Sequence, residues 1–216
     1  MATDAAPAVR PRLRGTLHRL TAPVAGAAFA LLALRADSPG HVVAVTIYGV
    51  CVTAMLSVSG VYHHRAIPPR ARRILKRVDH ATILLAIAGS YTAVTTIALT
   101  GTARVVMLVS VWVLAAIGIA IRMLWLDAPR PLTTAVYVLV GWSIAANLPG
   151  YLRALDGREF ALLAAGGLAY SVGGVVYARR APDPWPATFG FHEVFHTLVV
   201  LGAACHYATV WQMLAV

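Results

Sequence analysis

Residues 104–125 read RVVMLVSVWVLAAIGIAIRMLW, and this stretch decides the class of fold. The run from Val105 to Ile121 has no charged residue, and an arginine flanks it on each side. A helix of roughly 20 apolar residues crosses the hydrocarbon layer of a membrane. The stretch therefore predicts a transmembrane helix.

Six more apolar runs are bounded in the same way by charge, proline or glycine. With the first, the predicted spans are about 21–36, 42–63, 79–100, 104–125, 131–149, 159–178 and 190–215. The 216 residues are 59% hydrophobic and 12% charged, whereas soluble domains carry about 25% charged residues. We predict an all-α, polytopic membrane protein in which residues 21–216 form one seven-transmembrane-helix bundle.

The basic residues are divided unevenly between the two sides of the predicted bundle. With the N-terminus inside, inner segments hold 14 of the 18, and outer segments hold Arg35, Arg104, Arg153 and Arg158. Cytoplasmic loops retain positive charge, so we expect a multi-pass protein of the cell membrane with its N-terminus inside and its C-terminus outside. Residues 1–20 are predicted to be a basic cytoplasmic tail, not a signal peptide. This topology explains the net charge of +10 without a nucleic-acid partner.

Ionisable side chains converge at one end of the predicted bundle. His63 closes the second span, Asp79 opens the third, and His192 and His196 lie at the start of the seventh. All three helix ends are predicted on the cytoplasmic side. Because an aspartate at the centre of a span costs roughly 2.5–3.5 kcal/mol, ionisable groups in such positions indicate a functional site.

The spacing of the histidines predicts a metal site. His192 and His196 are four residues apart, which places them on one helix face about 5–6 Å apart. With His63 they form a three-histidine zinc site that leaves a fourth position open for water, as catalytic zinc sites do. Asp79 is then expected to take a proton from the water, and Ser59 to orient His63 or bind a developing oxyanion.

Simpler interpretations exist for each residue taken alone. A histidine at a membrane interface is often only a polar residue at headgroup level, and we expect this, or exposure to solvent, for His18, His41 and His80. Asp79 fits an N-cap, and Ser59 fits a bond to its own helix backbone. His206, deep in the last span, is expected to be a buried hydrogen-bonding residue.

Three stretches of the chain carry a resemblance to a known family. They are SGVYH at 59–63, VDH at 78–80 followed by AGSYT at 88–92, and FHEVFH at 191–196 followed by Cys205-His206. From about 41 to 210 the chain resembles the hemolysin III family, the bacterial branch of the progestin and adipoQ receptor (PAQR) group. That group belongs to a wider superfamily that includes alkaline ceramidases. The chain departs from the family pattern at Ala93, where proline is expected.

The resemblance implies a fold, a cofactor and an activity. It implies seven helices and one zinc ion bound by His63, His192 and His196, with Asp79 and Ser59 beside it. It also implies zinc-dependent hydrolysis of a lipid amide such as ceramide, so the expected partners are the bilayer and a membrane lipid substrate or ligand.

Three other functions stay open. The zinc is structural if the protein is a membrane sensor or receptor. The family's older label suggests a membrane-disrupting hemolysin, although no polar stripe for a wide pore is evident. The sequence HEVFH also matches the metalloprotease pattern in which Glu193 is the base. The sequence leaves the lipid and the oligomeric state undetermined.

Overall fold

The computed structural model describes residues 10–64 and 67–215. Within these residues the chain is helical, apart from loops and one isolated β-bridge between Trp185 and Phe189. The elements are α1 (Thr16–Arg35), α2 (Pro39–Tyr62), α3 (Pro69–Ala98), α4 (Gly101–Leu124), α5 (Arg130–Gly141), the 3-10 helix η1 (Trp142–Asn147), α6 (Leu148–Ala154), α7 (Gly157–Arg179) and α8 (Phe191–Met213). The predicted all-α class is confirmed.

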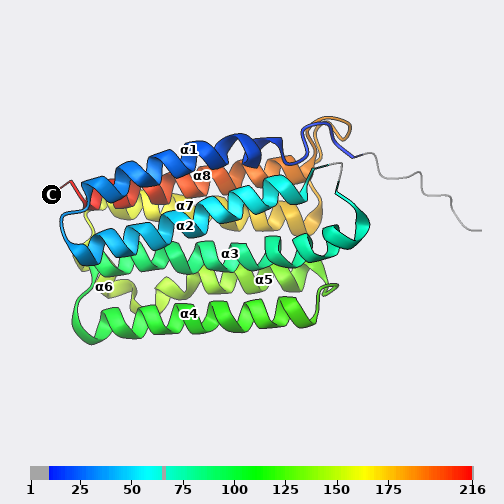
Figure 1. Ribbon diagram of the computed structural model, residues 1–216. Helices are drawn as coiled ribbons and strands as arrows, with labels where there is room; N and C mark the ends of the chain where they lie inside the picture. Colours follow the sequence, from blue (N-terminus) through cyan, green and yellow to red (C-terminus); the bar gives the residue numbers. More distant parts are fainter. Residues whose placement is uncertain (1–9, 65–66, 216) are drawn as a thin grey trace, which may run out of the picture.

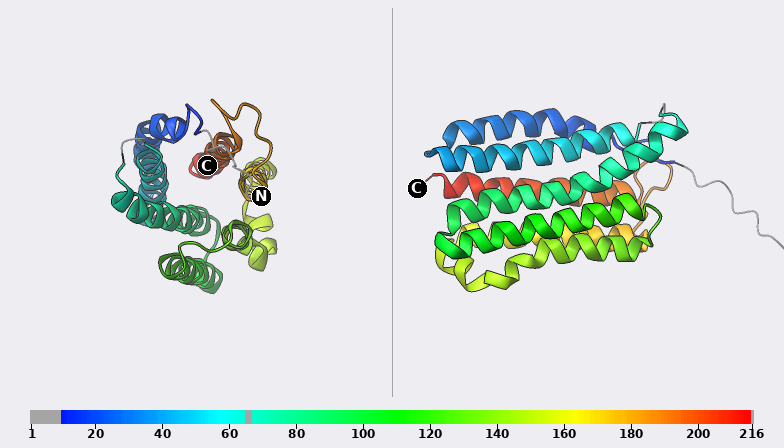
Figure 2. Two further views of the ribbon diagram at one scale, coloured as in Figure 1. Left: turned by 90° about the vertical axis from the view of Figure 1, so that its right-hand side faces the viewer. Right: turned by 60° about the horizontal axis from the view of Figure 1, so that its bottom comes forward.

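The described residues include seven spans long and apolar enough to cross a membrane, with α5, η1 and α6 together forming the fifth. The helices run alongside one another, and α1 begins and α8 ends at opposite ends of the bundle (Figures 1 and 2). Large apolar side chains face outward, and Leu34, Leu124 and Leu139 are each at least 71% exposed. Such a surface requires lipid to cover it. The protein is therefore a multi-pass membrane protein.

Helix α3 starts ten residues before the predicted third span. Its first turns, from Pro69 to Val78, are rich in arginine and lysine, so a search for apolar runs does not detect them. Asp79 consequently lies inside the helix with only 8% of its surface exposed, and the interpretation of Asp79 as an N-cap is wrong. The helix continues without a break through Ala93, which is fully buried. The first helix likewise begins earlier than predicted, at Thr16.

The fifth span is interrupted, although one continuous run over 131–149 is predicted. The α-helix ends at Gly141, a 3-10 turn follows, and a new α-helix begins one residue before Pro149. The Tyr91 hydroxyl donates a hydrogen bond to the Gly141 carbonyl at 2.7 Å and accepts one from the Ile144 amide at 2.6 Å. A break inside a membrane needs such partners, because no water is present to satisfy the backbone. Tyr91 of α3 thus stabilises the interruption.

Candidate metal centre

Three histidines from two distant parts of the sequence meet at the end of the bundle where α1 begins. His63 is the residue that caps α2, and His192 and His196 occupy the first two turns of α8. One ring nitrogen of each lies within 4.8 Å of the others, and Nε2 of His192 is 3.0 Å from Nε2 of His63. The three side chains can therefore hold one metal ion.

The triad is buried, and its surroundings favour the neutral form of His63. No more than 9% of any of the three residues is exposed. His63 lies just beyond the end of its span, where burial and then the positive charge of Arg14 lower its pKa to about 3. A neutral imidazole keeps a lone pair free for a metal. This electrostatic environment disfavours protonation of His63 and leaves it available as a ligand.

Asp79 and Ser59 lie beside the triad. Asp79 is on α3 and Ser59 on α2, one helical turn before His63. Both are buried, at 8% and 5% exposure, and the Ser59 hydroxyl lies within hydrogen-bonding reach of the Asp79 carboxylate. The structure thus places a carboxylate, a hydroxyl and three imidazoles in the lining of one cavity. Their chemical roles remain predictions.

A fourth histidine, predicted at the interface or in solvent, lies against the triad. His18 of α1 is only 3% exposed, and its ring stacks on that of His196 with centroids 3.8 Å apart and planes 4° apart. The prediction of an interfacial or solvent-exposed His18 is therefore wrong. The residue was misplaced because it lies in a basic segment before the first apolar run, and no spacing links it to another histidine.

His80 and His206 each make a polar contact with a residue of a neighbouring helix. His80 is half-buried, and its Nδ1 accepts a hydrogen bond from Arg122 Nε at 3.1 Å. This bond joins α3 to α4, so His80 is not freely exposed to solvent, and its place at the membrane interface stays a prediction. His206 contacts the Leu163 carbonyl of α7 at 3.2 Å through Nε2, as expected of a buried hydrogen-bonding residue.

Glu193, between the two histidines of α8, makes structural contacts. Its Oε2 accepts the amide hydrogen of Gly190 at 2.9 Å, and its Oε1 lies 2.6 Å from Nε of Arg14. The first contact caps the helix, and the second holds the chain segment that precedes α1. Glu193 is thus engaged on both carboxylate oxygens.

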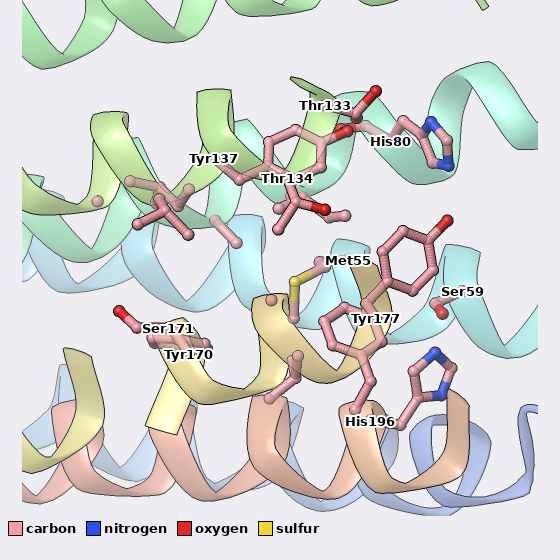
Figure 3. A pocket seen from close by; sticks show the side chains of 18 of the residues that line it. Met55, Ser59, His80, Thr133, Thr134, Tyr137, Tyr170, Ser171, Tyr177 and His196 are labelled. Atoms are coloured by element: carbon pink, nitrogen blue, oxygen red, sulfur yellow. The ribbon is translucent and has the colours of Figure 1, made fainter. Parts of the chain in front are cut away.

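A cavity of about 850 Å³ extends from the triad into the bundle. Figure 3 shows Ser59 and His196 at one end, with Tyr170 and Ser171 toward the other. Most of its wall is apolar. The apolar lining residues include Met55, Ile83, Ile87, Val94, Ile144, Leu148, Leu163 and Val199. The metal centre therefore opens onto a space of the size of typical ligand pockets, roughly 300–1,000 Å³.

A family model and two bacterial relatives match most of this chain. Residues 7–207 match the family model described as "Haemolysin-III related". The chain is 32% identical over 174 residues to the hemolysin-3 homolog of Bacillus subtilis (strain 168), covering 81% of this chain and 78% of the relative. It is 30% identical over 192 residues to hemolysin-3 of Bacillus cereus, covering 87% and 84%.

A eukaryotic relative extends the similarity. The adiponectin receptor protein of Drosophila melanogaster is 30% identical over 97 residues, which cover 40% of this chain and 22% of that protein. The family match includes all three histidines of the centre, and the bundle has the seven spans described above. The chain belongs to the hemolysin III family, within the PAQR group of membrane proteins.

Proposed function

We propose that this protein is a zinc-dependent hydrolase of a membrane lipid amide, with a ceramide-like substrate. The observation that carries the proposal is the presence of three buried imidazoles and a buried carboxylate in the lining of one largely apolar cavity. A metal-binding group that served only to stabilise the bundle would not need that cavity.

The donor set suits zinc. Imidazole nitrogens are common zinc ligands, at about 2.0–2.1 Å, so two nitrogens on one tetrahedral ion lie roughly 3.3 Å apart. The 3.0 Å between Nε2 of His63 and Nε2 of His192 is close to that value. With three protein ligands, a bound zinc ion supplies Lewis acidity that activates water and polarises a carbonyl.

Asp79 and Ser59 supply the proton chemistry in this proposal. Hydrolysis adds water to the amide carbonyl and breaks the C–N bond. Asp79 accepts a proton from the attacking water and delivers one to the leaving amine nitrogen. Ser59, within hydrogen-bonding reach of Asp79, holds the carboxylate in place.

The cavity supports a lipid substrate. Its apolar wall matches an acyl chain, and its polar end matches an amide beside the metal ligands. Burial of apolar surface contributes about 25 cal/mol per Å², so the chain supplies binding energy and the polar end fixes the position of the reacting bond. The substrate would enter from the bilayer that surrounds the spans.

The proposal is tested by metal analysis and lipid turnover on purified full-length protein. We expect His192→Ala to lose bound zinc, with affinity reduced by more than about 100-fold, because a direct ligand matters at least as much as the groups that orient ligands. His41→Ala, at the opposite end of the bundle, is the matched control and should keep the zinc. Equal zinc in both variants would contradict the site.

Asp79→Asn separates metal binding from catalysis. This variant should retain zinc and lose roughly 10²–10⁴-fold in the rate of lipid amide hydrolysis, the range for a general base. The substrates are N-acyl sphingoid lipids, and the fatty acid and free sphingoid base that they release are measured by mass spectrometry. Unchanged turnover in Asp79→Asn would rule out its role as the base.

The similarity to an adiponectin receptor supports a second candidate, a sensor whose metal is structural. In that case removal of zinc lowers the thermal stability, because metal binding contributes free energy to folding. No lipid amide would be hydrolysed by the metal-loaded protein. The two measurements together distinguish the candidates.

A further inference from the structure

The chain segment before α1 folds over the metal centre and fixes the position of His18. The amide of Arg12 bonds to the Ala187 carbonyl at 3.0 Å, and the amide of Leu13 to the Thr188 carbonyl at 3.1 Å. These bonds join segment 10–15 to the loop before α8. The helix that carries His18 is thereby held at the end of the bundle where the metal ligands lie.

A tight turn completes this attachment. Gly15 has a φ of 76°, in the left-handed region, and a Cβ at this position would lie 2.5 Å from Cβ of His63. Glycine is required both for the conformation and for the close approach. Segment 10–15 therefore packs directly against His63, a predicted metal ligand. His18 follows less than one helical turn later.

The stacked arrangement with His196 keeps His18 from acting as a fourth ligand. Parallel rings 3.8 Å apart direct their nitrogen lone pairs side by side rather than toward a common point. The group of ring nitrogens within 4.8 Å of one another comprises His63, His192 and His196. The ring of His18 instead packs flat on that of His196 and lines the cavity.

Apart from a contact with the backbone of His196, neither ring nitrogen of His18 has a hydrogen-bond partner among the described residues, although the side chain is buried. Buried polar groups in native proteins are almost always paired, so an unpaired one requires an explanation. A neutral imidazole has one N–H donor and one acceptor nitrogen. A hydroxyl group can pair with either nitrogen, since it both donates and accepts.

We propose that His18 hydrogen-bonds the primary hydroxyl of the lipid headgroup at the end of the cavity where the metal ligands lie. This inference deepens the lipid amide function and rests on it for the class of ligand. Stacking on His196 fixes the ring, the nitrogens recognise the headgroup, and the substrate is thereby defined as a lipid amide that carries a hydroxyl near the amide.

The test compares the binding of two lipids that differ in that hydroxyl. The probes are N-octanoylsphingosine and its 1-deoxy analogue, and the proteins are zinc-loaded, full-length and reconstituted in phosphatidylcholine nanodiscs. An Asp79→Asn background prevents turnover of the probe. We expect the hydroxylated probe to bind roughly threefold to tenfold more tightly, the factor that one neutral hydrogen bond supplies.

His18→Phe keeps a flat ring for the stack and removes both nitrogens. We expect it to abolish the preference for the hydroxylated probe, to leave the affinity for the deoxy probe within about twofold, and to retain zinc. His41→Phe, at the other end of the bundle, should keep the preference.

Three results would overturn the role of His18: a preserved preference in His18→Phe, loss of zinc from that variant, or no binding of either probe. The wild-type protein tests the underlying function separately. If it discriminates between the probes but hydrolyses neither, the hydrolase proposal fails while the recognition by His18 stands.

Discussion

The contacts of Glu193 give its side chain a structural role. It follows His192 in the sequence, so on a helix it points about 100° away from that ligand. This direction takes it toward Arg14 and the amide of Gly190. In the metalloprotease pattern the same position supplies the base, but here one carboxylate oxygen caps α8 and the other pairs with Arg14.

We expect Glu193→Gln to retain lipid turnover and to lower stability. The amide oxygen can still cap the helix, but Arg14 loses its paired charge at a site where the side chains are 18% and 4% exposed. The expected loss is about 1–3 kcal/mol, measured as a lower Tm with unchanged turnover per bound zinc. Glu159→Gln is the control, since Glu159 caps α7 without an ion pair among the described residues.

A large loss of lipid turnover in Glu193→Gln, with zinc retained, would instead indicate that Glu193 acts as the base, as in the metalloprotease pattern.

For single residues, the sequence predicts membership of the metal site where a residue has a helical spacing to another ligand or lies at the end of a predicted span. His63, His192 and His196 were found because two of them lie four residues apart and the third closes a predicted span. His18 was not found, because the stack that defines it joins α1 to α8 across the whole length of the chain. Such a contact leaves no local pattern.

At the scale of the element, small residues set how closely α7 and α8 approach. A Cβ on Gly166 would clash with the ring of His206, whereas a Cβ on Gly167 would meet nothing within 4 Å. The glycine lets the histidine ring lie across α7. Small residues at helix contacts are a general feature of packing in membranes.

We expect Gly166→Ala to destabilise the protein by about 1–3 kcal/mol through overpacking, while Gly167→Ala should be neutral or slightly stabilising because alanine favours helix. The two variants add the same methyl group at adjacent positions. Thermal unfolding in detergent provides the comparison, and equal Tm values would refute close packing at Gly166.

Element boundaries were predicted only as far as hydropathy determines them. Apolar runs locate the hydrocarbon-spanning part of each helix, but α3 continues as helix through a charged segment from Pro69. The interruption of the fifth span depends on Tyr91, which comes from another helix. Tertiary contacts of this kind are not encoded in the local composition.

At the scale of the whole molecule, the number of spans followed directly from hydropathy and is confirmed. The orientation in the membrane stays a prediction that rests on the distribution of arginine and lysine. It depends on the insertion process as well as on the folded structure, since basic loops are retained on the cytoplasmic side.

Single cysteines test this orientation after Cys51 and Cys205 are replaced by alanine. Thr100→Cys lies between α3 and α4, and Trp185→Cys lies in the exposed loop before α8. With the N-terminus inside, a membrane-impermeant thiol reagent should label position 100 on intact cells and position 185 only after permeabilisation. The reverse pattern would contradict the predicted topology.

The attachment of segment 10–15 to the loop before α8 has a consequence for biosynthesis. Residues on α1 and α2 leave the ribosome long before their partners on α8 exist. Until the last helix inserts, His18 and His63 have neither His192 nor His196 beside them, and Arg14 has no counter-ion. Completion of the metal centre must therefore be among the final events of maturation. A nascent chain stalled before α8 would lack two of the three predicted ligands and would be inactive.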